Sequence, residues 1–214
     1  ADMAVDIKDF SAEFIASSKA LLITGTHFST ANTYNTSMKA IEYAKASDTK
    51  VIIDIDYRPV LWGLTGLGDG ESRFIPSDDV SQHMQTILPY CDVIVGTEEE
   101  IHITGGSEDT ITALKQIRKL SSSIIVLKLG PLGCTVISSD IPDSSANFEV
   151  IKGNKVDILN VLGAGDAFMS GFLRGYLRNV NLEKSANYAN ASGALVVSRH
   201  GCAPAIPSEN ELFY

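Results

Sequence analysis

The segment NVLGAGDAFMSGFLRGYL, residues 160–177, places small residues directly before an aspartate at the predicted start of a helix. Gly163, Ala164 and Gly165 let a ligand come close to the backbone, and the unpaired N–H groups of a helix start favour anions. Asp166, in the first turn, could then accept a proton from a hydroxyl while those N–H groups hold phosphoryl oxygens. The spacing alone also fits an aspartate that only stabilises the helix start.

A second group of polar residues follows an apolar run rich in β-branched side chains. In IDIDYRPVLW, residues 53–62, Asp56 and Arg58 stand where this predicted strand ends. Parallel sheets bind ligands at the carboxyl ends of their strands, and a guanidinium offers a planar set of donors for a carboxylate or for sugar oxygens. On chemistry alone, a surface ion pair is the alternative.

The glycine-rich segment GLTGLGDGESRF, residues 63–74, has neither a strand directly before it nor a helix opening from it. Its spacing therefore does not predict a nucleotide-binding loop. A mobile loop is the default interpretation, and a loop that faces the substrate is the alternative. The chain contains no GxxxxGK[ST] string, which excludes a P-loop kinase.

Short apolar runs alternate with longer helical patterns, which predicts an α/β fold with a parallel sheet and helices on both faces. Strands are predicted at 20–26, 50–56, 92–97 and 123–130, with a hairpin partner at 134–138 and an edge strand at 148–152. Helices are predicted at 29–46, 78–89, from 98, at 107–119, 165–178 and 182–199, with Thr30 or Asn32 and Asn181 as N-caps and Gly201 as a final stop.

Composition and charge limit the classes of function. Of the 214 residues, 44% are apolar and 20% are charged, as in an ordinary globular protein. The net charge of −9 disfavours long nucleic acids but permits ATP at a local patch of N–H groups and cations. No apolar run approaches the roughly 20 residues of a membrane span. The three cysteines are sparse and form no CxxC pair. We expect a cytoplasmic protein with neither nucleic acid nor membrane as a partner.

The string GAGDAFMSGFL resembles the second signature of the PfkB, or ribokinase-like, family of carbohydrate kinases. In that family the aspartate is the catalytic base and the residues before it form an anion hole. The resemblance implies these roles for Asp166 and for residues 163–165, and it implies a three-layer ribokinase-like fold with ATP as a substrate.

The likeness continues in the family's order along nearly the whole chain. LKLGPLGCTVI, residues 127–137, is similar to the nucleotide-contacting strand and turn, which implies that Lys128, Gly130 and Gly133 lie near ATP. VSRHGCAPAIP, residues 197–207, resembles the stretch that closes over the adenine. The resemblance also implies nucleotide contacts at Asn190 and Gly201.

CDVIVGTEEEIHITGG, residues 91–106, resembles the segment that carries the family's NxxE motif. The resemblance implies that Glu100 organises the hydrated Mg²⁺. The chain departs from the family at two places, because Thr97 replaces the asparagine of NxxE and Asn160 replaces the aspartate that often helps to bind a monovalent cation. The sequence therefore does not decide whether a K⁺ site is present. Carbonyls near residues 196, 199 and 201 would line it.

Residues 53–62 resemble the substrate strand of the family's sugar-acid kinases that act on 2-keto-3-deoxygluconate. The resemblance is closer to those that phosphorylate 5-dehydro-2-deoxygluconate in inositol breakdown, and THFST, residues 26–30, supports it. It implies that Asp56 and Arg58 bind a sugar acid. Fructose ranks third as a substrate, and a non-catalytic nucleotide- or sugar-binding module is the alternative from another class.

The family's N-terminal GG-type sugar signature and its small β lid do not occur in this sequence. We therefore expect residues 1–214 to form the C-terminal nucleotide-binding and catalytic portion of a PfkB-type kinase domain, with the N-terminal strands and the lid absent. A homodimer is compatible with this expectation.

Overall fold

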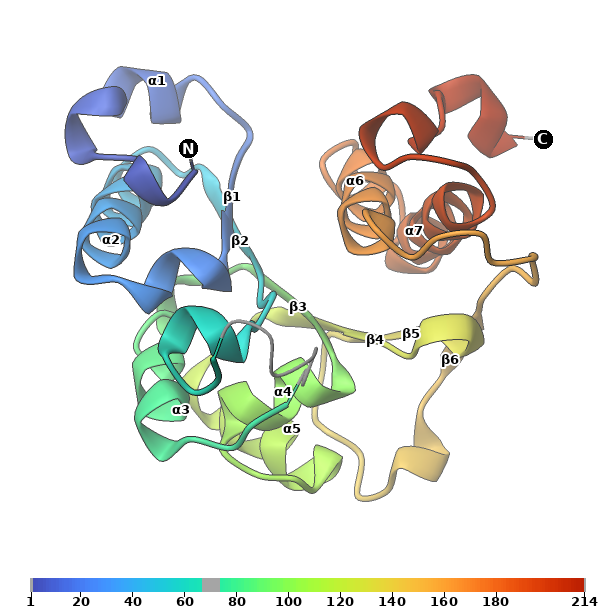
Figure 1. The fold of residues 1–214 in the computed structure, drawn as a ribbon, viewed down its shortest axis with the longest axis horizontal. Helices are drawn as coiled ribbons and strands as arrows, with labels where there is room; N and C mark the ends of the chain where they lie inside the picture. The colour runs from blue at the N-terminus through green and yellow to red at the C-terminus, as the bar shows by residue number, and fades with distance from the viewer. Residues whose placement is uncertain (1, 67–73, 214) are drawn as a thin grey trace. The chain divides into compact units, whose positions relative to one another are not determined.

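The structure is a computed structural model that describes residues 2–66 and 74–213 (Figure 1). Six strands form one sheet in chain order: β1 (Ala20–Thr24), β2 (Lys50–Asp54), β3 (Val93–Thr97), β4 (Ile124–Lys128), β5 (Gly133–Ile137) and β6 (Val150–Lys152). β2 pairs in parallel with β1 and with β3, whereas β6 runs antiparallel to β5. The predicted α/β fold with a mainly parallel sheet is confirmed.

The α-helices are α1 (Ala12–Ala16), α2 (Ala31–Ala46), α3 (Asp78–Gln85), α4 (Glu98–Gly105), α5 (Thr110–Leu120), α6 (Ala164–Tyr176) and α7 (Leu182–Val197). Short 3-10 helices are η1 (Asp2–Ala4), η2 (Ile7–Asp9), η3 (Gly25–Ser29), η4 (Pro59–Trp62), η5 (Leu88–Tyr90), η6 (Gly130–Leu132), η7 (Ser145–Asn147), η8 (Ala203–Ala205) and η9 (Glu209–Phe213). Thr30 and Asn181 cap α2 and α7 through their side chains, as predicted.

Three predicted helix ends are wrong, and one of them belongs to the helix predicted over 165–178, which ends at Tyr176. The helix predicted over 78–89 ends at Gln85, and a separate 3-10 turn follows with a proline in its first positions. A proline removes a donor and fixes φ, so the α-helix cannot run through it. The last long helix ends at Val197 rather than at residue 199, and Gly201, with φ of 97°, lies in the loop beyond it.

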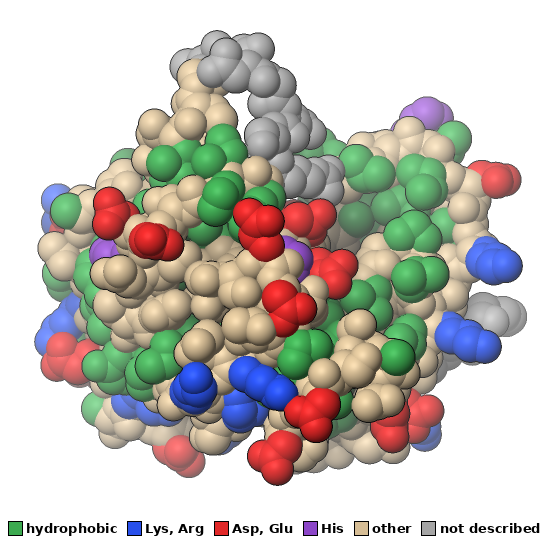
Figure 2. Space-filling view, turned by 90° about the horizontal axis from the view of Figure 1, so that it is seen from below, with side chains coloured by type: hydrophobic (Ala, Val, Ile, Leu, Met, Phe, Trp, Pro, Cys, Tyr) green, Lys and Arg blue, Asp and Glu red, His purple; other side chains and the backbone are tan. Residues whose placement is uncertain are grey.

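The chain divides into two compact units. Unit 1 comprises Ala1–Val126 and Ile137–Asn147, and unit 2 comprises Leu127–Val136 and Phe148–Tyr214. On the face seen in Figure 2, acidic, basic and apolar side chains of the described residues are interspersed. Within the described part of the chain, none of the helices is long and apolar enough to cross a membrane.

Unit 1 has the buried core of a parallel sheet. The middle residues of β2 and β3 are fully buried, as in strands covered on both faces. Buried apolar side chains of these strands and of the helices beside them include Val51, Ile52, Ile53, Val93, Ile94, Val95, Ile101, Ala113, Leu114 and Ile117. This core fixes the carboxyl ends of β1, β2 and β3, where the polar residues stand.

Unit 2 is built on the packing of α6 against α7. A Cβ on Gly171 would collide with the backbone carbonyl of Tyr188. A Cβ on Gly175 would likewise collide with Ser185 on α7. Phe172, between these glycines, is fully buried. The close approach of the two helices therefore depends on small residues along one face of α6, and it fixes where α6 begins.

Ion pairs attach the C-terminal segment of unit 2 to α6 and to the end of α7. One carboxylate oxygen of Glu209 pairs with Arg174 and, at 3.1 Å, with Arg178. Glu211 pairs with Arg199 at 2.6 Å and accepts hydrogen bonds from the backbone N–H and the hydroxyl of Ser208. These bonds hold η9 in place.

The Glu211 pairs make the stability of this segment depend on pH. The hydrogen bonds from Ser208 and Arg199 lower the pKa of Glu211 from 4.5 to about 2. A lowered folded-state pKa gives stabilisation that is present above about pH 4.5 and is lost as the pH falls toward 2. Glu211→Gln should therefore lower the melting temperature at pH 7, and the difference from wild type should shrink at pH 3. The exposed Glu149→Gln serves as control, and a pH-independent difference would contradict the account.

Candidate active site

The start of α6 has the geometry that the glycine motif predicts. Gly163 is the N-cap residue and has φ of 82°, a left-handed conformation that glycine adopts without strain. A Cβ at this position would also collide with the thiol of Cys202. By contrast, a Cβ on Gly165 would meet no atom within 4 Å. The backbone of the first turn is therefore open on the side of Gly165.

The first turn of α6 has N–H groups without partners. Ala167 donates to the carbonyl of Gly163 at 2.9 Å, but no side chain caps the helix. The described residues provide no hydrogen-bond acceptor for the N–H of Gly165 or of Asp166. Because the helix dipole adds positive potential here, this turn can bind an anion. Asp166 lies in the same turn with an exposed side chain.

Asn160 joins the turn before α6 to the loop after α7. Its Oδ1 accepts the N–H of Leu162 and its Nδ2 donates to the carbonyl of Gly201, both at 2.8 Å. A K⁺ ion would need that carbonyl, and the amide of Asn160 places an N–H donor against it. One of the carbonyls predicted to line a K⁺ site thus already accepts a hydrogen bond, and the K⁺ site stays a prediction.

In the strand and turn that are predicted to contact the nucleotide, the backbone conformation explains why glycines are present. Lys128 is the last residue of β4, and Gly130 has φ of 57° with open space around its Cα. Gly133 has φ of 107°, and a Cβ there would collide with the carbonyl of Ile151 on β6. Gly133 is thus required by the β5–β6 pairing, and the contact of these residues with a nucleotide stays a prediction.

Asn190, also predicted to contact the nucleotide, is almost fully buried on α7. Its Nδ2 donates to the carbonyl oxygens of Ile151 at 3.0 Å and of Lys152 at 3.2 Å. These bonds attach α7 to β6. The residue therefore has a structural role that the sequence did not reveal, and its nucleotide contact stays a prediction.

In unit 1, Asp56 follows β2 in a strained backbone conformation. Its φ of 34° is unusual for a residue other than glycine, and such strain is concentrated at functional sites. The carboxylate of Asp56 accepts from Arg58 Nε at 3.0 Å and Nη2 at 3.4 Å. Both side chains are partly exposed, at 34% for Asp56 and 63% for Arg58. The ion pair that the sequence left as an alternative is thus present.

The structure adds a residue that the sequence analysis missed. Thr24, at the end of β1, places its Oγ1 3.3 Å from Asp56 Oδ2 and 3.2 Å from Thr26 Oγ1. Thr24 pairs in register with Asp54, so the ends of β1 and β2 lie side by side. The signal available in the sequence was a hydroxyl at the carboxyl end of a predicted strand.

Glu100 lies in the first turn of α4, directly after β3, and takes part in capping this helix. Its Oε2 accepts the N–H of Thr97 at 2.6 Å, and Thr97 Oγ1 accepts the N–H of Glu100 at 3.3 Å, so the two residues form a capping box. Among the described residues, no group of three or more His, Cys, Asp or Glu could hold a metal. The predicted role of Glu100 toward a Mg²⁺ that arrives with ATP stays a prediction.

The segment 63–74 is described only at its ends, since residues 67–73 lie outside the described residues. Gly63 closes η4 with φ of 70°. The hydroxyl of Tyr57 donates to the carbonyl of Ile75 at 2.7 Å, and burial raises the pKa of Tyr57 to about 12. Phe74 lies edge-on to His102 at 6.0 Å. The prediction of a substrate-facing loop is untested.

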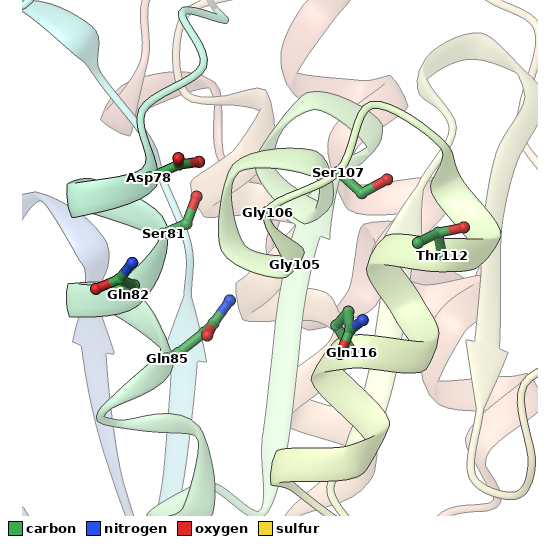
Figure 3. Close-up of a pocket in the computed structure, with 9 residues that line it drawn as sticks. All are labelled: Asp78, Ser81, Gln82, Gln85, Gly105, Gly106, Ser107, Thr112 and Gln116. Atoms are coloured by element: carbon green, nitrogen blue, oxygen red, sulfur yellow. The ribbon is translucent and has the colours of Figure 1, made fainter.

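Unit 1 also contains a cavity of about 270 Å³ that none of the predicted site residues lines (Figure 3). Its lining comes from α3, α4, α5 and the turn after α4: Asp78, Ser81, Gln82, Gln85, Gly105, Gly106, Ser107, Thr112 and Gln116. Figure 3 shows Gln85 and Gln116 on either side of Gly105. The lining is mostly uncharged and contains no Lys or Arg, so it does not suit a phosphate group.

Comparison with known proteins agrees with this geometry. The model of the pfkB family of carbohydrate kinases matches residues 4–209. The chain is 27% identical over 216 residues to 5-dehydro-2-deoxygluconokinase of Bacillus subtilis (strain 168), covering 99% of this chain and 61% of that protein. It is 30% identical over 213 residues to 5-dehydro-2-deoxygluconokinase of Clostridium beijerinckii, covering 97% and 58%. The chain thus spans about 60% of the length of these relatives.

Solved structures share the fold. Fructokinase from Vibrio cholerae O395, in a form with fructose, ADP and calcium bound, has a TM-score of 0.78 at 21% identity, covering 98% of this chain and 63% of that one. Aminoimidazole riboside kinase from Salmonella enterica, in complex with aminoimidazole riboside and an ATP analogue, has a TM-score of 0.77 at 18% identity, covering 100% and 67%. At these identities the likeness shows a ribokinase-like fold and nothing finer.

The two glycines of the motif should respond differently to a methyl group. Gly163→Ala must adopt a left-handed φ and collide with Cys202, so it should lower the melting temperature. Gly165→Ala has room and removes a glycine from a helix, which is worth about 0.5–1 kcal/mol of stability. Its methyl group, however, projects where an anion would approach. Gly165→Ala should therefore slightly raise the melting temperature and weaken binding of a non-hydrolysable ATP analogue roughly tenfold, or ~1.4 kcal/mol. Unchanged affinity in calorimetry would argue against an anion site here.

Proposed function

Because this chain belongs to the pfkB family of carbohydrate kinases, we propose that its full-length protein transfers the γ-phosphoryl group of ATP to a hydroxyl of a sugar acid. The observation that carries the proposal is the start of α6. Two N–H groups there have no acceptor among the described residues, and the exposed carboxylate of Asp166 stands in the same turn. An anion site beside a carboxylate is what transfer of a phosphoryl group to a hydroxyl requires.

In the proposed reaction, Asp166 acts as general base. The acceptor hydroxyl oxygen attacks the γ-phosphorus as its proton passes to the Asp166 carboxylate. The bond from phosphorus to the β–γ bridging oxygen breaks, and ADP leaves. The N–H groups of Gly165 and Asp166, which have no acceptor among the described residues, hold the phosphoryl oxygens, whose charge they stabilise without reorganising. The family resemblance implies the stretch 163–165 for this role, but the N–H of Ala164 donates to the carbonyl of Val161 at 3.3 Å.

Nucleotide binding is proposed for residues of unit 2. Lys128 at the end of β4 supplies a cation for phosphate oxygens, and the turn at Gly130 and Gly133 lets the nucleotide approach the backbone. Asn190 and Gly201 complete this set of contacts by family resemblance. When bound, Mg²⁺ neutralises part of the phosphate charge, and Glu100 would hold it through its water shell.

The acceptor is proposed to be 5-dehydro-2-deoxygluconate. Relatives that are 27% and 30% identical carry the name of that kinase, and Asp56 and Arg58 supply a charged pair at a strand end. 2-Keto-3-deoxygluconate and fructose are the alternative acceptors, and a non-catalytic sugar- or nucleotide-binding protein is the alternative from another class. A binding protein would take up ATP or sugar without forming ADP.

Replacement of the proposed base tests the reaction. Asp166→Asn in the full-length protein should keep the affinity for ATP nearly intact, because the N–H groups remain. Turnover should fall by roughly 100-fold or more, the usual contribution of a general base. Asp157→Asn, at another exposed position of unit 2, serves as the matched control in the same ADP-release assay. Equal turnover of Asp166→Asn and wild type would assign the base to another residue.

The role of Arg58 can be tested by comparing acceptors. A carboxylate of the substrate can share the guanidinium with Asp56, and charge-assisted hydrogen bonds contribute roughly 1.5–3 kcal/mol, or about 10- to 150-fold in affinity. Arg58→Ala should weaken the sugar acid by about this factor and leave activity on fructose largely unchanged. An equal loss for both acceptors would mean that the Asp56–Arg58 pair holds the loop and does not recognise the acid.

A further inference from the structure

Four rings of unit 1 form a continuous aromatic column, made of Phe28, Tyr34, His83 and Trp62. The centroids of Phe28 and Tyr34 lie 6.1 Å apart in an edge-on contact. His83 follows at 4.3 Å from Tyr34, with the two rings tilted by 43°. Trp62 lies edge-on to His83 at 5.7 Å. Such ring contacts are favourable beyond the apolar area they bury, so the column resists displacement of any one member.

The column joins the segments that follow two neighbouring strands. Phe28 belongs to η3, which begins directly after Thr24 of β1, and it is 2% exposed. Trp62 ends η4, which begins directly after Arg58. Tyr34 and His83, from α2 and α3, form the middle of the column. The hydroxyl of Tyr34 also lies 3.0 Å from Thr86 Oγ1 at the end of α3, which fixes the two helices together.

Asp56 and Arg58, which lie between the end of β2 and Trp62, need contacts that hold their backbone in place. Asp56 keeps a positive φ of 34°, and a strained conformation persists only where the surrounding structure enforces it. The Asp56–Arg58 ion pair is largely exposed and by itself a weak restraint. Among the described residues, no side-chain hydrogen bond caps η4 at its N-cap residue Arg58. The buried Tyr57, whose hydroxyl donates to the carbonyl of Ile75, and the buried Pro59 restrain the chain on either side of Arg58. The packing of Trp62 on His83 adds a restraint at the other end of η4.

We propose that His83 is a positioning residue for the acceptor subsite. Its ring, held between Tyr34 and Trp62, fixes η4 and so presents Asp56 and Arg58 to the acceptor in one conformation. His83 touches neither Asp56 nor Arg58 in any contact described above, and it acts through Trp62. The inference rests on the proposed function, because it assigns the acceptor to the Asp56–Arg58 pair.

The test compares His83→Leu with His83→Phe in the full-length enzyme. Leucine removes the ring, whereas phenylalanine keeps a ring of similar breadth that can contact Tyr34 and Trp62. His83→Leu should raise the KM for the sugar acid about tenfold and leave the KM for ATP within about twofold. His83→Phe should restore the acceptor KM to within about threefold of wild type. Trp62→Leu should match His83→Leu, and the double variant should lose little more, because both changes break one contact.

Three outcomes would overturn the proposal. A lower melting temperature with an unchanged acceptor KM would make the column a stabilising feature only. Equal changes in the KM for ATP and in the KM for the sugar acid would show that the column does not act specifically on the acceptor subsite. A His83→Phe variant as impaired as His83→Leu would show that the ring contact is not what matters.

Hydrogen exchange of residues 56–62, measured without ligand in the same variants, separates this inference from the proposed function. Faster exchange in His83→Leu but not in His83→Phe would support the restraint of η4 even if the wild-type protein phosphorylated no sugar acid. In that event the proposed function would fail while the structural link stood. Unchanged exchange in His83→Leu would overturn the positioning role whatever the acceptor proves to be.

Discussion

The N–H groups of Gly165 and Asp166 in the first turn of α6 have no acceptor among the described residues, so water or a ligand must supply one. The left-handed conformation of Gly163 sets the direction of the helix, and the neighbouring Cys202 leaves no room for a side chain there. Asn160 attaches the same turn to the loop after α7. Small residues such as Gly171 hold α6 close to α7. These contacts therefore fix the backbone of the turn that we propose as the anion site.

Unit 1 applies a different constraint to its polar residues. The parallel strands β1 and β2 end side by side, and Thr24 and Asp56 meet through a hydrogen bond at these ends. The strain at Asp56 and its pairing with Arg58 give a charged group in a defined orientation. Under the proposed function, an acceptor that bears a carboxylate would share Arg58 with Asp56, so its recognition would depend on geometry as much as on net charge.

Local patterns in the sequence predicted the strands, most helices and the position of Asp166, because each depends on residues close together in the chain. The end of α3 was missed since the proline at position 89 was not weighed against the helical spacing. The pairing of Thr24 with Asp56 spans 32 positions, and the burial of Asn190 against β6 spans 39. Contacts of this range depend on the tertiary fold. The positive φ at Asp56 could not be predicted from the sequence either, because most aspartates adopt negative φ even though Asp enters the left-handed region more often than most residues.

The most direct test of the central claim is ³¹P NMR of the full-length protein incubated with ATP, Mg²⁺ and 5-dehydro-2-deoxygluconate. Kinase activity predicts that the γ-phosphate signal is replaced by that of a sugar phosphate monoester, with one ADP formed for each monoester. Formation of inorganic phosphate in place of the monoester would contradict the proposal that this protein transfers a phosphoryl group from ATP to a sugar hydroxyl. No consumption of ATP with any sugar acid or hexose would contradict it as well.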